Sequence, residues 1–314
     1  MKTLIEVPAD SVKAEALKLG FDLVGVCRAQ EPPHLAAYED WIEKGRHASM
    51  DYLRRHLPLK RHPDALLPGV KTIIAVGLNY NQPRPQNPKI ARYALGRDYH
   101  KVLRGKLYKL SARLEQNHPE ARFRACVDSA PVMERDFAQL AGLGWFGKNT
   151  MLINSARGSW FFLGLLLTTV PFETDLPASG SCGTCTRCVD ACPTGAIIFD
   201  DGRWQIDARR CISYQTIEHS GALEVDAQGW VFGCDVCQEV CPFNQARANQ
   251  PLRAAPTPEP EFRATRAWPP PEVLARLSYD EWDQLTRGSA IRRAGHEGLR
   301  RNAAQALAQE PVQR

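Results

Sequence analysis

At 314 residues, the chain is long enough for two or three domains with a sizeable hydrophobic core. Its formal net charge of +5 is too small to indicate a polyanionic partner by itself. Ten cysteines are too few for a secreted disulfide framework, the sequence opens without a signal peptide, and its longest apolar run, residues 160–170, is too short to span a bilayer. We therefore expect a cytoplasmic protein with no membrane partner.

Residues 1–178 show the mixed helix and strand patterns of an α+β domain. We expect a helix over 11–19, with Ser11 as its N-terminal cap and Gly20 closing it. Residues 142–147 are rich in glycine and predict a turn. Apolar periodicity predicts strands at 21–27, 71–77, 122–127 and 160–169, and helices at 103–114 and 133–141.

Positive charge is concentrated in residues 80–125, where eleven Lys or Arg face three Asp or Glu. Two interpretations stay open at this point. The excess forms the solvated face of a helix, or it forms a surface for a polyanion, where pairing with phosphates releases counterions.

Residues 182–193 read C-x2-C-x2-C-x3-C-P, the spacing of bacterial two-cluster iron–sulfur proteins. A second run, 234–242, has the same ending but lacks the first cysteine, where Val231 stands. Two 4Fe–4S clusters need eight thiolates and the runs supply seven, so we assign Cys211, which lies between them, as the eighth. Crossing the ends as in bacterial ferredoxins gives Cys182, Cys185, Cys188 and Cys241 for cluster 1, and Cys192, Cys211, Cys234 and Cys237 for cluster 2.

A zinc site is a weaker alternative for the cysteines of the two runs. C-x2-C pairs also suit zinc ribbons, but two C-x3-C-P endings are not typical of zinc sites. The remaining cysteines, Cys27 and Cys126, lie in apolar strands, and we expect both in the core.

The last part of the chain changes in character. Residues 249–271 are rich in proline and predict a linker along the surface. Residues 272–314 are expected to be helical, with two short helices within 289–307 that resemble a HEAT-type repeat unit and must pack on the body of the protein. Residues 250–314 hold ten basic and eight acidic side chains, so only the Arg-Arg pairs argue for phosphate contacts.

Five segments in order, spanning about residues 10–310, resemble the epoxyqueuosine reductase family. They are RYALGRDYH at 92–100, VDSAPVMER at 127–135, GWFGKNT at 144–150, the cluster pattern, and RRAGHEGLRRN at 292–302. The resemblance implies a nitroreductase-like α/β cobalamin-binding domain over 1–178, similar to that of the corrinoid reductive dehalogenases. It further implies a two-cluster ferredoxin-like module over 179–248, the linker 249–271 and a HEAT-like tRNA-binding segment over 272–314.

The resemblance implies the last step of queuosine synthesis, in which epoxyqueuosine at the wobble position of tRNA is reduced to queuosine. Electrons from an external low-potential donor, such as a flavodoxin or ferredoxin, would pass through the clusters to cobalamin. The family's catalytic acid falls on Asp128, whose pKa we expect burial against the corrin and substrate to raise, so that it is protonated near neutral pH. From position alone, Asp128 also fits a cap of the helix at 133–141.

The cobalamin pocket is expected at the start of the helix after Asp98 and at two glycine-bearing turns. Asp98-Tyr99-His100 partly matches the corrinoid motif D-x-H-x-x-G, but Leu103 replaces the glycine. We therefore interpret Tyr99 and His100 as pocket or proton-relay residues. Ordinary packing is the main alternative to this role, and cobalt ligation is the least favoured one. The full expected set is Arg61, Tyr99, His100, Lys148, Asn149, Gly158, Ser159 and Ser213. Phosphate contacts to the tRNA anticodon loop are expected from Arg209, Arg210, Arg292, Arg293, Arg300 and Arg301.

Two other functions remain as alternatives. Another corrinoid reductase acting on a small molecule, as in the dehalogenases, would usually carry an export signal. A simple electron carrier would need only the cluster module, which leaves about 250 residues without a purpose. No heptad or apolar seam indicates assembly, so we expect a monomer.

Overall fold

The computed structural model describes residues 6–264 and 266–308. A four-stranded antiparallel sheet in the order β1-β2-β7-β4 organises the first half of the chain. The strands are β1 (Leu23–Arg28), β2 (Thr72–Asn79), β7 (Phe161–Thr168) and β4 (Phe123–Cys126). β2 is a nearly continuous apolar run and is buried along almost its whole length, because helices cover both faces of the sheet. β4 pairs only with β7 and forms one edge.

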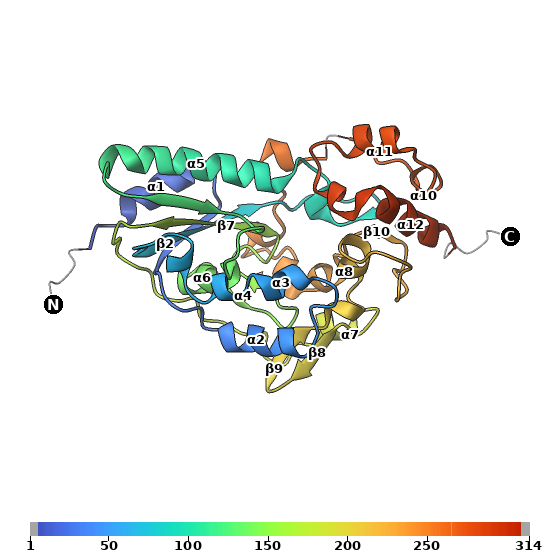
Figure 1. Ribbon diagram of the computed structural model, residues 1–314, viewed down its shortest axis with the longest axis horizontal. Coiled ribbons are helices and arrows are strands. Elements are labelled where there is room, and N and C mark those ends of the chain that lie inside the picture. The colour runs from blue at the N-terminus through green and yellow to red at the C-terminus, as the bar shows by residue number, and fades with distance from the viewer. Residues whose placement is uncertain (1–5, 265, 309–314) are drawn as a thin grey trace.

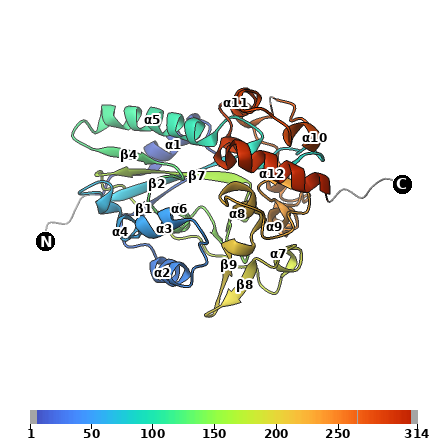
Figure 2. The ribbon, with the colours of Figure 1, turned by 45° about the vertical axis from the view of Figure 1, so that its right-hand side comes forward.

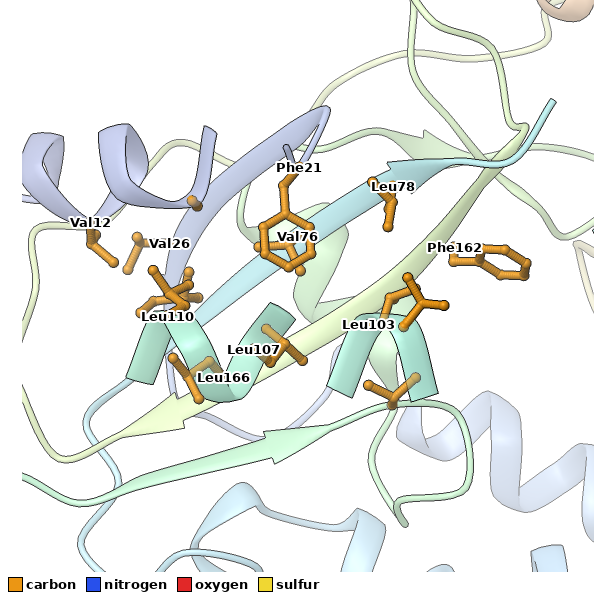
Figure 3. Close-up of a cluster of buried hydrophobic side chains, with 14 of the residues drawn as sticks. Val12, Phe21, Val26, Val76, Leu78, Leu103, Leu107, Leu110, Phe162 and Leu166 are labelled. Carbon is orange, nitrogen blue, oxygen red and sulfur yellow. The ribbon is translucent and has the colours of Figure 1, made fainter. Parts of the chain in front are cut away.

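One face of the sheet is covered by α1 (Asp10–Lys18) and α5 (Tyr99–Asn117). Leucines recur on α5 at three- and four-residue spacing, and Leu103, Leu107 and Leu110 meet sheet residues such as Val76 and Leu166 (Figure 3). The opposite face packs against α6 (Glu134–Leu140), whose Phe137 is fully buried. Cys27 and Cys126 are buried in this second core, which confirms their predicted place.

Three helices between β1 and β2 were not predicted from the sequence. They are α2 (Leu35–Glu43), α3 (Asp51–Arg55) and α4 (Leu57–Lys60). They lie on the same side of the sheet as α6 (Figure 1). α2 also contacts the iron–sulfur region, since the Trp41 indole donates to the Ile206 carbonyl at 2.6 Å.

The cysteine-rich region folds into short elements. They are α7 (Arg187–Asp190), the hairpin β8 (Ile197–Asp200) and β9 (Arg203–Ile206), α8 (Ile212–Ile217), β10 (Trp230–Phe232) and α9 (Val236–Glu239). α7 and α9, one from each cysteine run, contact each other. β10 pairs in parallel with β3 (Lys89–Ile90), which ties the region to the body of the protein.

The proline-rich stretch is packed against the body along its length. It contains the 3-10 turns η5 (Pro251–Ala254) and η6 (Pro260–Phe262). The Thr257 amide donates to the Asn81 carbonyl at 2.7 Å, and Phe262 is buried in the main core. This stretch is therefore a strap rather than a free spacer.

The C-terminal elements are α10 (Pro271–Leu274), α11 (Tyr279–Thr286), η7 (Ala290–Ala294) and α12 (Gly295–Ala308). α12 packs on α10, β10 and α8, and Leu299 and Ala303 are fully buried in a shared apolar cluster. Figure 2 shows these helices gathered beside α8. The expected packing on the body is confirmed, but the first of the two helices predicted within 289–307 is only a 3-10 turn.

Two local predictions were wrong. α1 begins at Asp10, so Ser11 lies inside the helix. The N-cap residue is Ala9, whose side chain cannot accept a hydrogen bond from the first turn. The glycine-rich stretch contains strand β5 (Trp145–Phe146), which pairs with β6 (Leu152–Ile153).

The remaining 3-10 turns are η1 (Pro63–Ala65), η2 (Arg92–Ala94), η3 (Ala208–Arg210) and η4 (Pro242–Asn244). Over the described ranges, no helix combines the length and apolar character that crossing a membrane requires.

Candidate active site and iron–sulfur ligands

Asp128 lies two residues beyond the edge strand β4, where it meets the first turn of α5. Its backbone has a φ of +49°, in the left-handed region that non-glycine residues seldom adopt. Its Oδ2 atom accepts a hydrogen bond from the Tyr99 hydroxyl at 2.7 Å and lies 2.8 Å from Nε2 of His100. The structure thus brings together three predicted site residues from two separate segments.

His100 is held from both sides of its ring. Nδ1 lies 2.8 Å from Oδ1 of Asp98, which also accepts the His100 amide and so caps α5. Burial alone lowers the pKa of His100, but its hydrogen bonds to Asp128 and Asp98 outweigh burial and raise the pKa to about 9. Both ring nitrogens are engaged, so neither is available as a cobalt ligand in this arrangement.

The expectation that corrin and substrate bury Asp128 and raise its pKa stays a prediction, and in the protein by itself the Asp128 side chain is 57% exposed. Burial acts to raise its pKa, but hydrogen bonds from His100 and Tyr99 prevail and lower it below its usual value. At neutral pH, Asp128 is therefore a carboxylate and the proton is on His100.

Sequence reasoning missed Glu134, although it lies in the same motif as Asp128. Glu134 is the first residue of α6, and its Oε1 atom accepts a hydrogen bond from the backbone amide of Asp128. Burial, followed by the nearby charge of Asp128, raises the pKa of Glu134 to about 8, so this carboxyl group is mostly protonated at neutral pH.

The space in front of Asp128 is partly enclosed by protein. Asp128 is solvent-accessible, yet burial is the largest influence on its pKa. The same holds for Lys60, which is half-buried, donates to the Val132 carbonyl at 3.3 Å and has a pKa lowered chiefly by burial. Protein atoms therefore surround both side chains although solvent reaches them, and we call this part of the surface the Asp128 recess.

Arg293 of the C-terminal segment lies at the same recess. Its guanidinium donates twice to the Glu218 carboxylate, at 2.8 and 2.7 Å, and lies 5.6 Å from the ring centroid of Tyr52 on α3. It is also close enough to contribute to the lowered pKa of Asp128. Of the six arginines predicted to contact tRNA, Arg293 is therefore the one whose charge reaches Asp128.

The other five arginines have different surroundings. Arg209 pairs with Asp207 at 2.6 Å, and Arg292 pairs with Asp283 at 2.8 Å. Arg300 donates a hydrogen bond to the Ala275 carbonyl. The Arg301 guanidinium donates hydrogen bonds to backbone carbonyl groups of the protein. Arg210 is exposed, and no ion pair is formed by it within the part of the chain that the structure describes.

The basic excess in 80–125 is largely paired within the protein. Arg84 and Arg92 both contact Glu239, and Lys106 pairs with Glu259 at 2.8 Å. Other cations in this stretch pair with acidic residues elsewhere: Arg97 with Glu261, and Arg113 with Glu15. These contacts favour a structural use of the charge over a dedicated polyanion surface.

The cysteines gather into the two predicted sets. A cavity is lined by Cys182, Cys185, Cys188 and Cys241, and the pKa of Cys188 is raised to about 11 by burial and then by the three other thiols. Burial also raises the pKa of Cys237, followed in order by the effects of Cys234, Cys211, Cys188 and Cys192. Three of these four thiols are of the second predicted set, and the assignment of Cys211 to that set stays a prediction. No three described His, Cys, Asp or Glu side chains are placed to hold a single metal ion, whereas a cubane distributes four thiolates over four iron corners.

Four residues predicted to contact cobalamin lie between the body and the cysteine runs, and their contact with cobalamin stays a prediction. Lys148 donates to the Gly183 carbonyl at 2.9 Å, and Asn149 donates to the Cys237 carbonyl at 3.1 Å. The Ser159 amide donates to Asn244 at 2.7 Å, and a side chain at Gly158 would collide with the same Asn244. These residues hold the cluster loops, and none has a recorded contact with Asp128.

The remaining two predicted pocket residues, Arg61 and Ser213, lie in different parts of the protein. Arg61 is exposed at the end of α4 and pairs with Glu39 at 2.7 Å. Ser213 follows Cys211 directly, and its backbone and hydroxyl groups hydrogen-bond to the Cys211 sulfur. Ser213 therefore lies beside the second cysteine set, as expected from the sequence.

The fold and the cysteine sets define the class: a mixed α+β protein with a two-cluster ferredoxin-like region. A model described as "4Fe-4S double cluster binding domain" matches residues 181–244, and one described as "Epoxyqueuosine reductase QueG, DUF1730" matches residues 60–129. The chain is 40% identical to an epoxyqueuosine reductase of Vibrio cholerae, over 96% of this chain and 84% of that protein. The chain belongs to the epoxyqueuosine reductase family.

Solved structures of the family agree. An epoxyqueuosine reductase with an epoxyqueuosine-modified tRNA-Tyr stem loop matches 95% of this chain and 80% of its own, with a TM-score of 0.81 and 30% identity. The enzyme from Bacillus subtilis, with the loop of its catalytic aspartate swung out of the active site, matches the same shares with a TM-score of 0.77 and 30% identity. A reductive dehalogenase shares the fold at 16% identity, with a TM-score of 0.51 over 96% of this chain and 39% of its own.

Proposed function

We propose that this protein reduces epoxyqueuosine to queuosine at the wobble position of tRNA. The observation that carries the proposal is the contact of Asp128 with Tyr99 and His100, in a chain that belongs to the epoxyqueuosine reductase family. The stem-loop complex of a relative supports tRNA as the substrate. The chain is then an oxidoreductase with an RNA-bound substrate.

The reaction needs two electrons and two protons. The epoxide loses both of its carbon–oxygen bonds, a carbon–carbon double bond forms, and the oxygen leaves as water. Two 4Fe–4S clusters deliver electrons one at a time. Gly183, Thr184 and Arg187, which lie beside the first cysteine set, are exposed to solvent. We infer that an external low-potential donor such as a flavodoxin or ferredoxin reduces cluster 1, and cluster 2 passes electrons inward.

The second cofactor we propose is cobalamin, which supplies a metal centre that gathers single electrons and acts on carbon or oxygen. The shared fold with a reductive dehalogenase is compatible with it. Both nitrogens of His100 are engaged, which suits a corrinoid bound without a protein histidine. Tyr99, His100 and Ser213 would contact it directly. Lys148, Asn149, Gly158 and Ser159 would act by holding the cluster loops, and Arg61 would lie at the periphery.

Asp128 delivers a proton to the departing oxygen, and His100 is its proton source. In the free protein, the proton is on His100, 2.8 Å from the Asp128 carboxylate. Substrate that covers Asp128 removes it from water, which raises its pKa and favours transfer of the proton from His100 to Asp128. The acid is thus formed only when substrate is bound.

The wobble base must leave its stack to reach the recess, and phosphates must be held outside it. Arg293 at the rim of the recess and the unpaired Arg210 beside Cys211 are best placed for phosphate, with Arg209, Arg292 and Arg300 as outer candidates. We also propose that the chain divides into four parts, at 1–178, 179–248, 249–271 and 272–314. We propose further that the protein is a monomer.

The test is anaerobic reconstitution with iron, sulfide and cobalamin, followed by turnover of epoxyqueuosine in an anticodon stem loop. Formation of the alkene, together with about eight irons per chain, supports the proposal. A protein that binds cobalamin but leaves the stem loop unchanged would instead favour a corrinoid reductase for small molecules. A protein that binds no corrinoid overturns both.

A further inference from the structure

The backbone of Asp128 is held in a conformation that needs support. β4 ends at Cys126, which is paired with Leu165, so the sheet ladder stops before Asp128. At a φ of +49°, a residue with a side chain is crowded against its own backbone. The Asp128 amide nevertheless has a partner, since it donates to the Glu134 carboxyl group six residues further on.

We propose that Glu134 is a positioning residue that holds Asp128 in its working orientation. By accepting the Asp128 amide, it keeps the left-handed turn and directs the Asp128 carboxylate toward Tyr99 and His100. The inference rests on the proposed function, because it takes Asp128 as the acid. It adds a residue that touches neither substrate nor cofactor.

The surroundings of Glu134 suit this task. It begins α6, so its backbone is fixed by a helix whose Phe137 is buried under the sheet. The loop before it is fastened as well, because the Val132 amide donates to the Ala130 carbonyl at 2.8 Å and the Val132 carbonyl accepts Lys60. The acceptor for the Asp128 amide is therefore presented from a rigid element.

The protonation state of Glu134 also fits a neutral acceptor. Burial and the charge of Asp128 raise its pKa to about 8. A neutral carboxyl group still accepts a hydrogen bond through its carbonyl oxygen, and it avoids placing a second negative charge beside Asp128. A glutamine side chain has the same length and the same carbonyl acceptor, so it should replace Glu134 in this role.

The experiment compares E134A and E134Q in the reconstituted full-length protein, with Glu272→Ala as the matched control. Glu272 also lies in the first turn of a helix, α10, but is exposed at the far end of the chain. The measurements are iron and cobalamin content, kcat and KM for the stem loop, and the dependence of kcat on pH. Displacement of a catalytic group by about 1 Å can cost on the order of 100-fold in rate.

We expect E134A to lose about 10- to 100-fold in kcat, with KM within about twofold of wild type and full iron and cobalamin content. E134Q should restore kcat to within about threefold and leave the pH profile unchanged. If E134Q is as inactive as E134A, Glu134 acts as a proton source and the proposal is overturned. Unchanged activity of E134A overturns it as well.

Should E134A fail to fold, E134D decides the question, because it keeps the carboxyl group and the helix start but withdraws the acceptor by one methylene. A tenfold or greater loss of kcat in folded E134D supports positioning, and wild-type activity overturns it. Failure of the proposed function is recognised separately. In that case the wild-type protein itself leaves the stem loop unchanged, or D128A remains active.

Discussion

Nε2 of His100 and Oδ2 of Asp128 lie 2.8 Å apart, so a histidine at the start of α5 forms an ion pair with the residue that follows the edge strand β4. The pair keeps both partners charged, although burial by itself favours the neutral form of each. His100 has a pKa of about 9 and keeps its proton, while the pKa of Asp128 is lowered. The proton for the reaction is thus present in the free protein, one hydrogen bond from where it is needed.

Replacing Asp128 by Asn should abolish turnover while leaving the cofactors in place. The amide is nearly the same size but cannot donate a proton in exchange for one from His100, and a general acid contributes roughly 100- to 10,000-fold to a rate. We expect a loss of that size in single-turnover alkene formation, measured in protein with full iron content. Retention of more than about a tenth of wild-type activity would remove Asp128 as the acid.

The stability of the protein should fall as pH rises from about 6.5 to 9. The pKa of His100 is raised to about 9 in the folded protein, so its stabilising charge is fully present below its unfolded value of about 6.5 and disappears as pH passes 9. Glu134 acts in the same direction, because its raised pKa of about 8 means that ionising it disfavours the folded state.

His100→Gln isolates the histidine part of this effect. The variant lacks the titrating ring, so the difference in free energy of unfolding between wild type and variant should shrink as pH rises from 6.5 to 9.5. Urea unfolding of the two proteins at pH 6, 7.5 and 9.5, under anaerobic conditions, measures it. A difference that is constant over this range would show that His100 has an ordinary pKa.

Regular elements with a clear apolar period were predictable from the sequence. The leucines of 103–114 predicted α5, and the apolar runs at 71–77 and 160–169 predicted β2 and β7. The helices α2, α3 and α4 were missed because they are short and bury little: α2 buries Leu35 and Ile42, and α3 and α4 bury no residue, so no apolar period marks them. The β3–β10 pairing joins residues that are far apart in the sequence, and nothing local signals it.

Part of the candidate site was likewise predictable from the sequence, and part was not. The cysteine sets follow from spacing and counting, because a cluster requires a fixed number of thiolates. The link of Asp128 to Tyr99 and His100 needed the family motif to suggest it, since about thirty residues separate the two segments. The glycine-bearing turns at Lys148 and Gly158 were assigned to cobalamin, but in the folded chain they contact cluster loops. A glycine in a turn indicates that another group packs closely against the backbone, but it does not identify that group.

Cys211→Ser should remove the second cluster and leave the first. Cys211 is desolvated and lies near Cys192, and it is outside both cysteine runs. We expect the iron content of the reconstituted protein to fall from about eight to about four per chain. Cys27→Ala, which changes a buried core cysteine, should keep about eight. An unchanged iron count in Cys211→Ser would refute the choice of the eighth ligand.

Arg301→Ala should act on stability rather than on tRNA binding. Its guanidinium donates to the carbonyl groups of His219 and Gly221, both at 2.7 Å, and to that of Gln215 at 2.9 Å, so it fastens the end of α8 to α12. Leaving such acceptors unpaired costs about 2–3 kcal/mol. Arg300→Ala is the matched control and should cost under about 1 kcal/mol, since that side chain makes one bond to a carbonyl group, at 3.1 Å. Urea unfolding followed by circular dichroism compares the two, and equal midpoints would contradict the assignment.

Arg293→Gln should weaken binding of the stem loop and reduce its dependence on salt. Arg293 is half-exposed and its charge helps to lower the pKa of Asp128, so we expect it to lie near the path of an incoming nucleotide. One lost phosphate contact lowers the slope of log K against log salt by about 0.7–0.9. Binding of the anticodon stem loop measured by anisotropy from 50 to 300 mM salt gives this slope directly.

The control for Arg293 is Arg287→Gln. Arg287 is 73% exposed at the end of α11 and pairs with Asp283, so it carries a similar surface charge away from the recess. We expect its slope to match wild type within error. If both variants shift the slope equally, the effect is one of net charge. If neither does, the phosphates pass elsewhere, and Arg210, exposed beside Cys211, becomes the next residue to test.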